Sequence, residues 1–115
     1  MNTKTEILEK LKELKPLLQS DYNITEVGLF GSYIHGEEKP DSDIDILINY
    51  KAGTSIFTIG GLQYFLSEIF GKKVDIAMKN SLKRRIGKQI LSEVIYVWKD
   101  LYRLYWRYAS GLWRY

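Results

Sequence analysis

The segment 43–48, DIDILI, begins with acidic and apolar residues at alternating positions, and this alternation limits the folds that the chain can adopt. Successive side chains of a strand point to opposite faces of a sheet, so Asp43 and Asp45 share one face. A buried strand does not tolerate two neighbouring carboxylates without compensation, so this face predicts a functional site. The opposite face predicts a buried core and carries Ile44, Ile46 and Ile48.

The rest of the chain alternates between helical and extended patterns. Leucines at helical spacing follow a Thr3–Glu6 capping box and predict a first helix. Segments rich in β-branched and aromatic residues predict three strands, and capping residues at 54–55 and 80–81 predict two further helices. This order indicates an α/β (α+β) chain with a small mixed β-sheet and helices packed on it. The predicted elements are helices at 4–19, 54–70 and 80–98 and strands at 24–30, 43–49 and 73–79.

The charge of the chain is unevenly distributed. Its 115 residues suffice for one domain with a buried core. Residues 1–98 are electrically neutral, so the formal net charge of +3 belongs to residues 99–115. A neutral domain argues against long nucleic acid as a partner. We therefore predict a domain at 1–98 and an aromatic and basic C-terminal extension at 99–115.

The composition also bears on the compartment. The chain contains no cysteine, which excludes disulfide bonds and thiolate metal sites. The charged N-terminal stretch lacks a signal-peptide pattern, and no apolar run is long enough to span a bilayer. These features predict a cytoplasmic protein without a membrane partner.

A third aspartate repeats the acidic pattern. Asp75 lies between Val74 and Ile76 on the third predicted strand. If that strand lies beside 43–49, three carboxylates converge on one edge of the sheet, and their mutual repulsion calls for a cation. Because every candidate ligand atom is oxygen, Mg²⁺ or Mn²⁺ is the expected ion. Three converging acids suit phosphoryl transfer with two metals or with one metal and a base.

A Gly-Ser pair precedes the first two aspartates. Gly31 ends the first predicted strand at a point where the backbone can approach a ligand closely. Ser32 and the amides after it can donate hydrogen bonds to phosphate oxygens at the start of a short helix. A helix-capping role for Ser32 is an alternative that is compatible with phosphate binding.

The order of these residues resembles a known family. A Gly-Ser pair at 31–32, a ten-residue spacer, Asp43-x-Asp45 and a later Asp75 are similar to the nucleotidyltransferase superfamily of the DNA polymerase β type. Over residues 3–98 the chain more closely resembles its minimal nucleotidyltransferase (MNT) family. This resemblance implies a nucleotidyltransferase fold and the Mg²⁺-dependent transfer of a nucleoside monophosphate from a nucleoside triphosphate.

The same resemblance implies roles for individual residues. Asp43 and Asp45 would bind the metal. Asp75 would be the third carboxylate of the metal site and would activate the acceptor hydroxyl. Gly31 and Ser32 would hold the triphosphate.

The resemblance further implies a partner, because many MNT proteins are paired with a HEPN-domain toxin. Similar antitoxins silence a HEPN ribonuclease by adenylylating it, commonly on tyrosine, with ATP as the nucleotide. Two alternatives stay open: a catalytically weak module that neutralises its partner by contact, and transfer to a small molecule or to an RNA 3′ end. The sequence leaves the oligomeric state open.

One position departs from the family. Many relatives carry an arginine soon after the Gly-Ser pair, where this chain has YIH at 33–35. The phosphate charge would then be met by the metal or by a nearby basic residue, of which Arg84 is a candidate; a solvated helix face is the alternative interpretation of Arg84. The other basic candidates are Lys39, Lys83 and Arg85.

Simpler interpretations remain for the aspartates and for the extension. Asp43 and Asp45 could cap a turn after Pro40, and Asp75 could be an exposed strand residue. The extension at 99–115 contains six aromatic residues and could dock a partner, contact nucleic acid or be an atypical addition to the domain. Exposed aromatic residues and arginines favour the docking interpretation.

Overall fold

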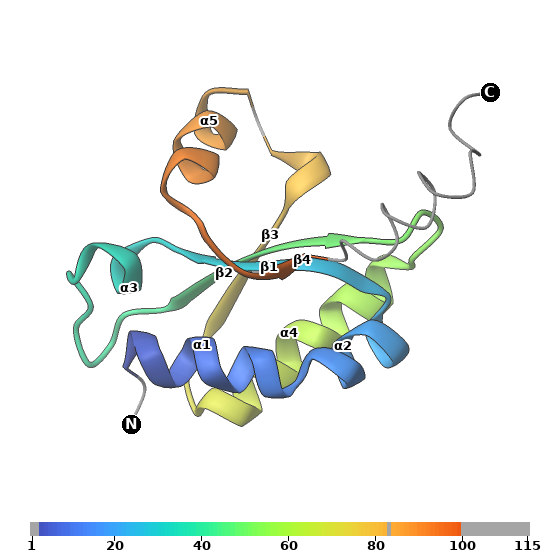
Figure 1. Cartoon of the computed structure of the whole chain (residues 1–115), viewed down its shortest axis with the longest axis horizontal. Helices are drawn as coiled ribbons and strands as arrows, with labels where there is room; N and C mark the ends of the chain where they lie inside the picture. Colours follow the sequence, from blue (N-terminus) through green and yellow to red (C-terminus); the bar gives the residue numbers. More distant parts are fainter. Residues whose placement is uncertain (1–2, 83, 100–115) are drawn as a thin grey trace.

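The computed structural model describes residues 3–82 and 84–99, without the side chains of Arg84 and Lys99. A mixed sheet with helices packed on it confirms the predicted fold class (Figure 1). No helix among these residues has the length and the apolar character that crossing a membrane requires. The elements are α1 (Lys4–Glu13), α2 (Lys15–Tyr22), β1 (Ile24–Phe30), α3 (Ser32–His35), β2 (Ile44–Tyr50), α4 (Ile56–Phe70), β3 (Val74–Met78), the 3-10 helix η1 (Lys79–Ser81), α5 (Arg84–Glu93) and β4 (Ile95–Lys99).

The four strands of the described chain form one sheet in the order β3-β2-β1-β4. β1 runs antiparallel to both β2 and β4, whereas β2 and β3 are parallel. Parallel strands need a crossover connection, and α4 provides it. β2 and β3 therefore begin at the same end of the sheet, and each carries an aspartate near that end.

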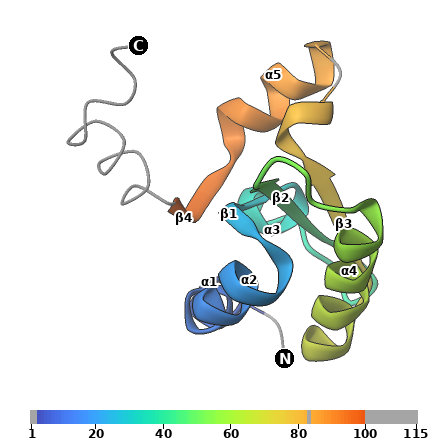
Figure 2. The ribbon, with the colours of Figure 1, turned by 90° about the vertical axis from the view of Figure 1, so that its right-hand side faces the viewer.

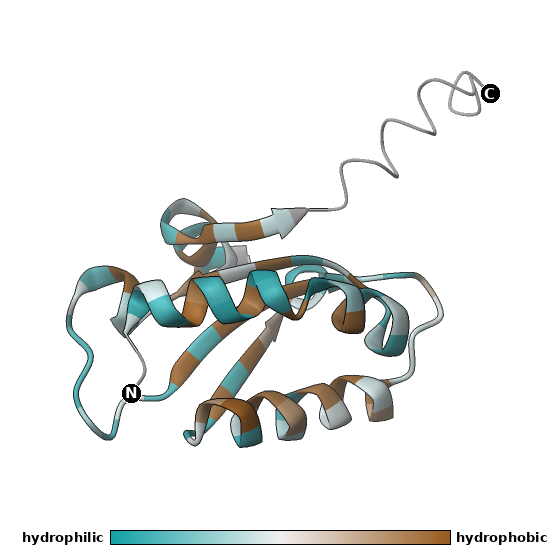
Figure 3. Ribbon diagram, turned by 60° about the horizontal axis from the view of Figure 1, so that its bottom comes forward, coloured by the Kyte–Doolittle hydropathy of each residue, from teal (hydrophilic) through white to brown (hydrophobic). Residues whose placement is uncertain are grey.

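The helices divide unequally between the two faces of the sheet. Figures 1 and 2 show α1, α2 and α4 on one side and α5 on the other. The apolar face of the strands packs on the three-helix side and forms the core. Apolar residues also run along α4 (Figure 3). Two of its large side chains, Phe57 in the first turn and Tyr64 in the middle, are exposed. The fully buried core side chains include Ile7, Leu11, Leu18, Ile24, Val27, Leu29, Ile44, Ile46, Ile48, Leu62, Leu66 and Val74.

The N-terminal helix is shorter than predicted. Its start is as expected, because the Thr3 hydroxyl accepts from the Glu6 amide and the Glu6 carboxylate accepts from the Thr3 amide. The helix does not continue to residue 19, however, and a second helix begins at Lys15 with Pro16 in its first turn. Proline lacks the amide that a helix interior needs but fits the first turn, so Pro16 divides the predicted helix.

The prediction of one final helix over 80–98 is also wrong. α5 ends at Glu93, and residues 95–99 form β4, the edge strand beside β1. The segment alternates Ile95 and Val97 with two aromatic residues, a composition that strands favour. Trp98 is buried, and its Nε1 donates to the carbonyl of Leu11, 3.3 Å away.

Candidate active site

Asp45 and Asp75 lie side by side on the two parallel strands. They are direct partners in the register of β2 and β3. Their neighbours Ile44, Ile46 and Val74 are buried in the core, so both carboxylates project from the opposite face of the sheet. This is the face on which α5 lies (Figure 1). The predicted convergence of these two residues is confirmed.

Asp43 lies immediately before β2, and Lys73 lies between its carboxylate and that of Asp75. Lys73 Nζ is 3.7 Å from Asp43 Oδ2 and 3.7 Å from Asp75 Oδ1. The Lys73 carbonyl accepts from the Ile44 amide at 3.0 Å, which fixes the start of β3 beside the start of β2. The side chains of Asp43 and Asp75 are 37% and 45% exposed, so solvent and small ligands can reach them.

The surroundings of Asp45 disfavour the charged form of its carboxyl group. Burial, together with the negative charges of Asp75 and Asp43, raises the pKa of Asp45 from 3.8 to about 6. Burial and repulsion both disfavour the ionised form of a carboxyl group. The three side chains therefore form a site with an excess of negative charge.

Gly31 lies against Asp45. Phe30 pairs with Asp45 in the register of β1 and β2, and the next residue, Gly31, turns the chain into α3 with φ 78° and ψ −148°. A Cβ at position 31 would collide with Oδ2 of Asp45. Both the backbone conformation and the space require glycine here. Ser32 follows as the first residue of α3, so the Gly-Ser pair and the carboxylates occupy one end of the sheet.

Two contacts hold α3 in this position. Lys72 Nζ donates to the hydroxyl of the buried Tyr33 at 2.7 Å. At the other end of α3, His35 Nε2 shares a hydrogen bond with Glu93 Oε2 on α5 at 2.9 Å. His35, which stands among the residues where an arginine was expected, is thus engaged by a carboxylate.

The profile of the nucleotidyltransferase domain family matches residues 5–97. The chain belongs to the nucleotidyltransferase domain family. The protein adenylyltransferase MntA of Thermococcus cleftensis is 41% identical to it over 97 residues, which cover 84% of this chain and 98% of that protein.

Solved structures agree with this assignment. A chain described as a minimal nucleotidyltransferase is 31% identical, with a TM-score of 0.67, and the match covers 78% of this chain and 92% of that one. A chain in the structure of a tri-AMPylated Shewanella oneidensis HEPN toxin in complex with MNT antitoxin is 17% identical, with a TM-score of 0.60. The match covers 93% of this chain and 87% of that one. At that identity the second match speaks for the fold alone. The nucleotidyltransferase fold predicted from the sequence is confirmed.

The donor set of this nucleotidyltransferase domain fits a divalent cation that prefers oxygen ligands. Three carboxylates converge, and Lys73 is the only cation that contacts them among the described ion pairs. In the described part of the chain, no three acidic or histidine side chains stand close enough together to hold a metal ion in their present rotamers. The side chains of Asp43 and Asp75 are partly exposed, so a hydrated ion can reach both carboxylates.

The structure describes only some of the basic residues that were proposed to balance the phosphate charge. Arg84 is the first residue of α5, its side chain is outside the description, and Lys83 is not described at all. Arg85 and Lys39 are exposed. Sequence reasoning missed Lys73, which contacts two of the carboxylates, although it stands two residues before Asp75 and so shares its face of the strand.

Proposed function

We propose that this chain is a metal-dependent nucleotidyltransferase that transfers AMP from ATP to a hydroxyl group of a partner protein. The observation that carries the proposal is the pairing of Asp45 with Asp75 on adjacent parallel strands, with Gly31 in contact with Asp45. The identity of 41% to a protein adenylyltransferase supports the choice of AMP and of a protein acceptor.

The reaction is a displacement at the α-phosphorus of ATP. The acceptor hydroxyl oxygen forms a bond to this phosphorus, the bond to the β-phosphate oxygen breaks, and pyrophosphate leaves. The proton of the hydroxyl passes to Asp75, which is near the site and partly exposed to the incoming acceptor. The products are pyrophosphate and a partner that carries AMP in a phosphodiester linkage.

The proposed residues divide the tasks of this scheme, and Asp75 has two of them, as proton acceptor and as metal ligand. Asp43, Asp45 and Asp75 hold Mg²⁺ or Mn²⁺, which when bound supplies positive charge to the phosphates. Gly31 leaves room for the Asp45 carboxylate and lets the backbone approach the triphosphate, and Ser32 donates to the phosphate oxygens. Arg84 is the proposed contact for the outer phosphates, since α5 lies over the carboxylate face (Figure 1).

The partner that we propose is a HEPN-domain ribonuclease toxin, modified on tyrosine. The names of the relatives support this choice: one is a protein adenylyltransferase, and another is an MNT antitoxin bound to an AMPylated HEPN toxin. In this proposal the chain acts as the antitoxin of the pair.

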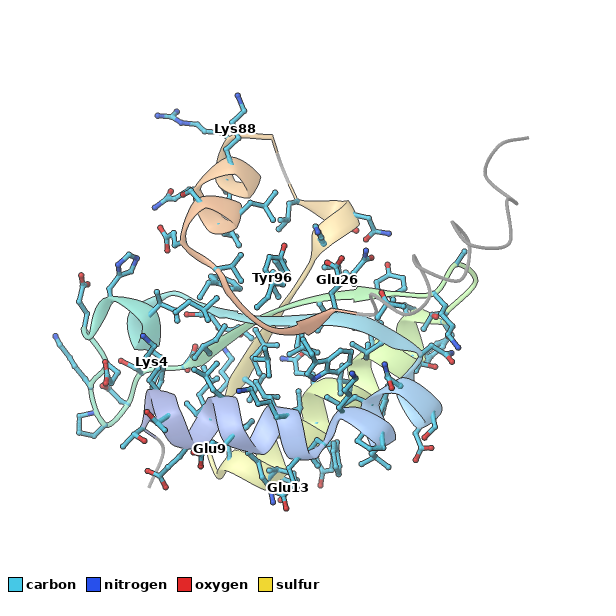
Figure 4. The ribbon with its side chains drawn as sticks, viewed as in Figure 1. Lys4, Glu9, Glu13, Glu26, Lys88 and Tyr96 are labelled. Carbon is cyan, nitrogen blue, oxygen red and sulfur yellow. The ribbon has the colours of Figure 1, made fainter. Side chains whose placement is uncertain are left out.

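The test is transfer of label from α-labelled ATP, with Mg²⁺, to the product of the neighbouring gene. We expect Asp43→Asn/Asp45→Asn to reduce labelling at least a hundredfold, because the metal site loses two of its ligands. The matched control is Glu9→Gln/Glu13→Gln, which removes two carboxylates from α1, on the opposite side of the sheet (Figure 4). Equal labelling by the aspartate double variant and the wild type would refute the mechanism.

Neutralisation by contact alone is the competing function. It predicts that the toxin is still silenced after loss of all three aspartates and is released when residues 100–115 are removed. The transfer mechanism predicts the reverse pattern, because the carboxylates are then essential and the extension is not.

A further inference from the structure

Lys73 lies between two of the three carboxylates, those of Asp43 and Asp75. Its Nζ is equidistant, at 3.7 Å, from an oxygen of Asp43 and an oxygen of Asp75. Neither the sequence motif nor the proposed reaction assigns a task to this lysine. It nevertheless places a positive charge between two carboxylates that repel each other.

The backbone places Lys73 there, while its side chain stays free to leave. The residue is anchored by its own carbonyl, which accepts from the Ile44 amide at 3.0 Å. The side chain is 67% exposed, and 3.7 Å is too long for a direct hydrogen bond to either carboxylate. Lys73 therefore balances charge without being locked in place.

We propose that Lys73 is the internal countercation of the metal-free site and competes with the divalent ion for Asp43 and Asp75. This inference rests on the proposed function, since it takes these carboxylates as metal ligands. The ammonium group must move away before both carboxylates can turn to one ion. Lys73 thereby weakens metal binding and limits occupancy of the site when no nucleotide brings a metal with it.

The neighbouring lysine provides a matched control. Lys72 has the same charge but points elsewhere: its Nζ donates to the Tyr33 hydroxyl and lies 3.5 Å from the carbonyl oxygen of Lys39. Lys88 on α5 is a second control, because it projects away from the sheet (Figure 4). Methionine at any of these positions removes one charge and keeps an unbranched side chain that is only one atom shorter.

The decisive measurement is the Kd for Mn²⁺ without nucleotide, from the electron paramagnetic resonance signal of the free ion. We expect Lys73→Met to lower this Kd roughly two- to tenfold, as removal of one or two exposed ion pairs allows. Lys72→Met and Lys88→Met should change it less, and Lys73→Arg should restore the weaker binding. A Kd for Lys73→Met that equals that of Lys72→Met, or exceeds that of the wild type, would overturn the proposal.

The aspartate variant separates this inference from the proposed function. If wild type binds Mn²⁺ and Asp43→Asn/Asp45→Asn does not, the metal site stands, and the lysine variants alone decide the role of Lys73. If the wild type and Lys73→Met both fail to bind Mn²⁺, the metal site and the competition are refuted together.

Thermal unfolding gives a readout that is independent of binding curves. With EDTA, Lys73→Met should unfold at a lower temperature than the wild type, because the carboxylates lose their only described countercharge. With saturating Mn²⁺ the difference should largely disappear, because the tighter binding of Lys73→Met offsets the ion pairs that it lost. A difference of the same size in both conditions would contradict the competition.

Discussion

Asp45 is held in its charged form only at a cost. The core-facing isoleucines on either side fix its backbone, so the carboxylate cannot withdraw from Asp75 on the next strand. A group whose pKa is higher in the folded state binds its proton more tightly when folded. The free energy of unfolding should therefore fall as pH rises from about 4 to about 6, the interval between the ordinary pKa of 3.8 and the raised value.

We predict that Asp45→Asn stabilises the metal-free protein at neutral pH. At pH 7.5 the gain should be about 1 kcal/mol, well below what the full change in pKa would give, because the carboxylate is partly exposed and screened. Near pH 4 the difference should vanish, since Asp45 is then protonated when folded. Urea unfolding in EDTA at both pH values checks this, and lower stability of the Asp45→Asn variant than of the wild type at pH 7.5 would contradict it.

Gly31 should be the least replaceable residue of the loop after β1. Gly31→Ala meets both an unfavourable backbone region and the carboxylate of Asp45, so we expect a loss of about 2–4 kcal/mol in the free energy of unfolding. The control is Gly36→Ala, which also has positive φ but open space around it and should cost about 1 kcal/mol. Urea unfolding of both variants measures the difference, and equal losses would show that contact with Asp45 contributes nothing.

At the level of elements, the correctly predicted strands and helices are those whose apolar residues recur at regular spacing or whose ends carry clear capping residues. β2 and β3 were predictable because apolar residues alternate with aspartates, and α4 because it starts at the Ser55 cap and ends at Gly71 in the left-handed conformation. The two failures have local causes. Pro16 sits where the leucine pattern continues unbroken, so the pattern hides the division between α1 and α2. β4 follows α5 after a single residue, and its apolar side chains also fit a helical stripe; only pairing with β1 decides its conformation.

The residues of the candidate site were predictable from the sequence, but the long-range contacts around them were not. The spacing of the motif indicated the aspartates and the Gly-Ser pair, because alternation places side chains on one face of a strand. The contacts of Lys73 and the bond between His35 and Glu93 depend on which strands and helices become neighbours, a separation of 58 residues in the latter case. No local pattern encodes such a contact.

Substitution of Trp98 measures how much β4 contributes to the free energy of unfolding. It is 9% exposed and belongs to the core cluster, so Trp98→Ala should lower the free energy of unfolding by about 3–5 kcal/mol. Trp98→Phe keeps most of the ring but loses the bond to Leu11, and should cost about 1–2 kcal/mol. Urea unfolding of both variants tests this; a small effect of alanine would mean that β4 is not part of the stable sheet.

At the scale of the whole molecule, the sheet separates two functions. Its apolar face, closed by α1, α2 and α4, supplies stability, and its other face carries the carboxylates. The predicted extension at 99–115 is, apart from Lys99 in β4, outside the described residues. Its role therefore stays a prediction, as does a domain boundary at 98.

We predict that a chain ending at Lys99 keeps both the fold and the transfer activity. β4 is complete at that residue, and the family match ends at 97. Thermal unfolding should change by no more than a few degrees, and labelling of the toxin should stay within about twofold of the full chain. A strong loss of toxin labelling with unchanged stability would instead assign partner docking to residues 100–115.

The bond between Trp98 and Leu11 joins residues 87 positions apart, so one edge of the sheet closes only when the two ends of the domain meet. Closing a loop of that length costs roughly 4 kcal/mol of chain entropy, which favours late formation of the contact. Until β4 docks, β1 is an unpaired apolar edge, although it is an inner strand of the finished sheet. Such an edge invites pairing with other chains, so the partly folded protein should be most prone to aggregate before its last strand is in place.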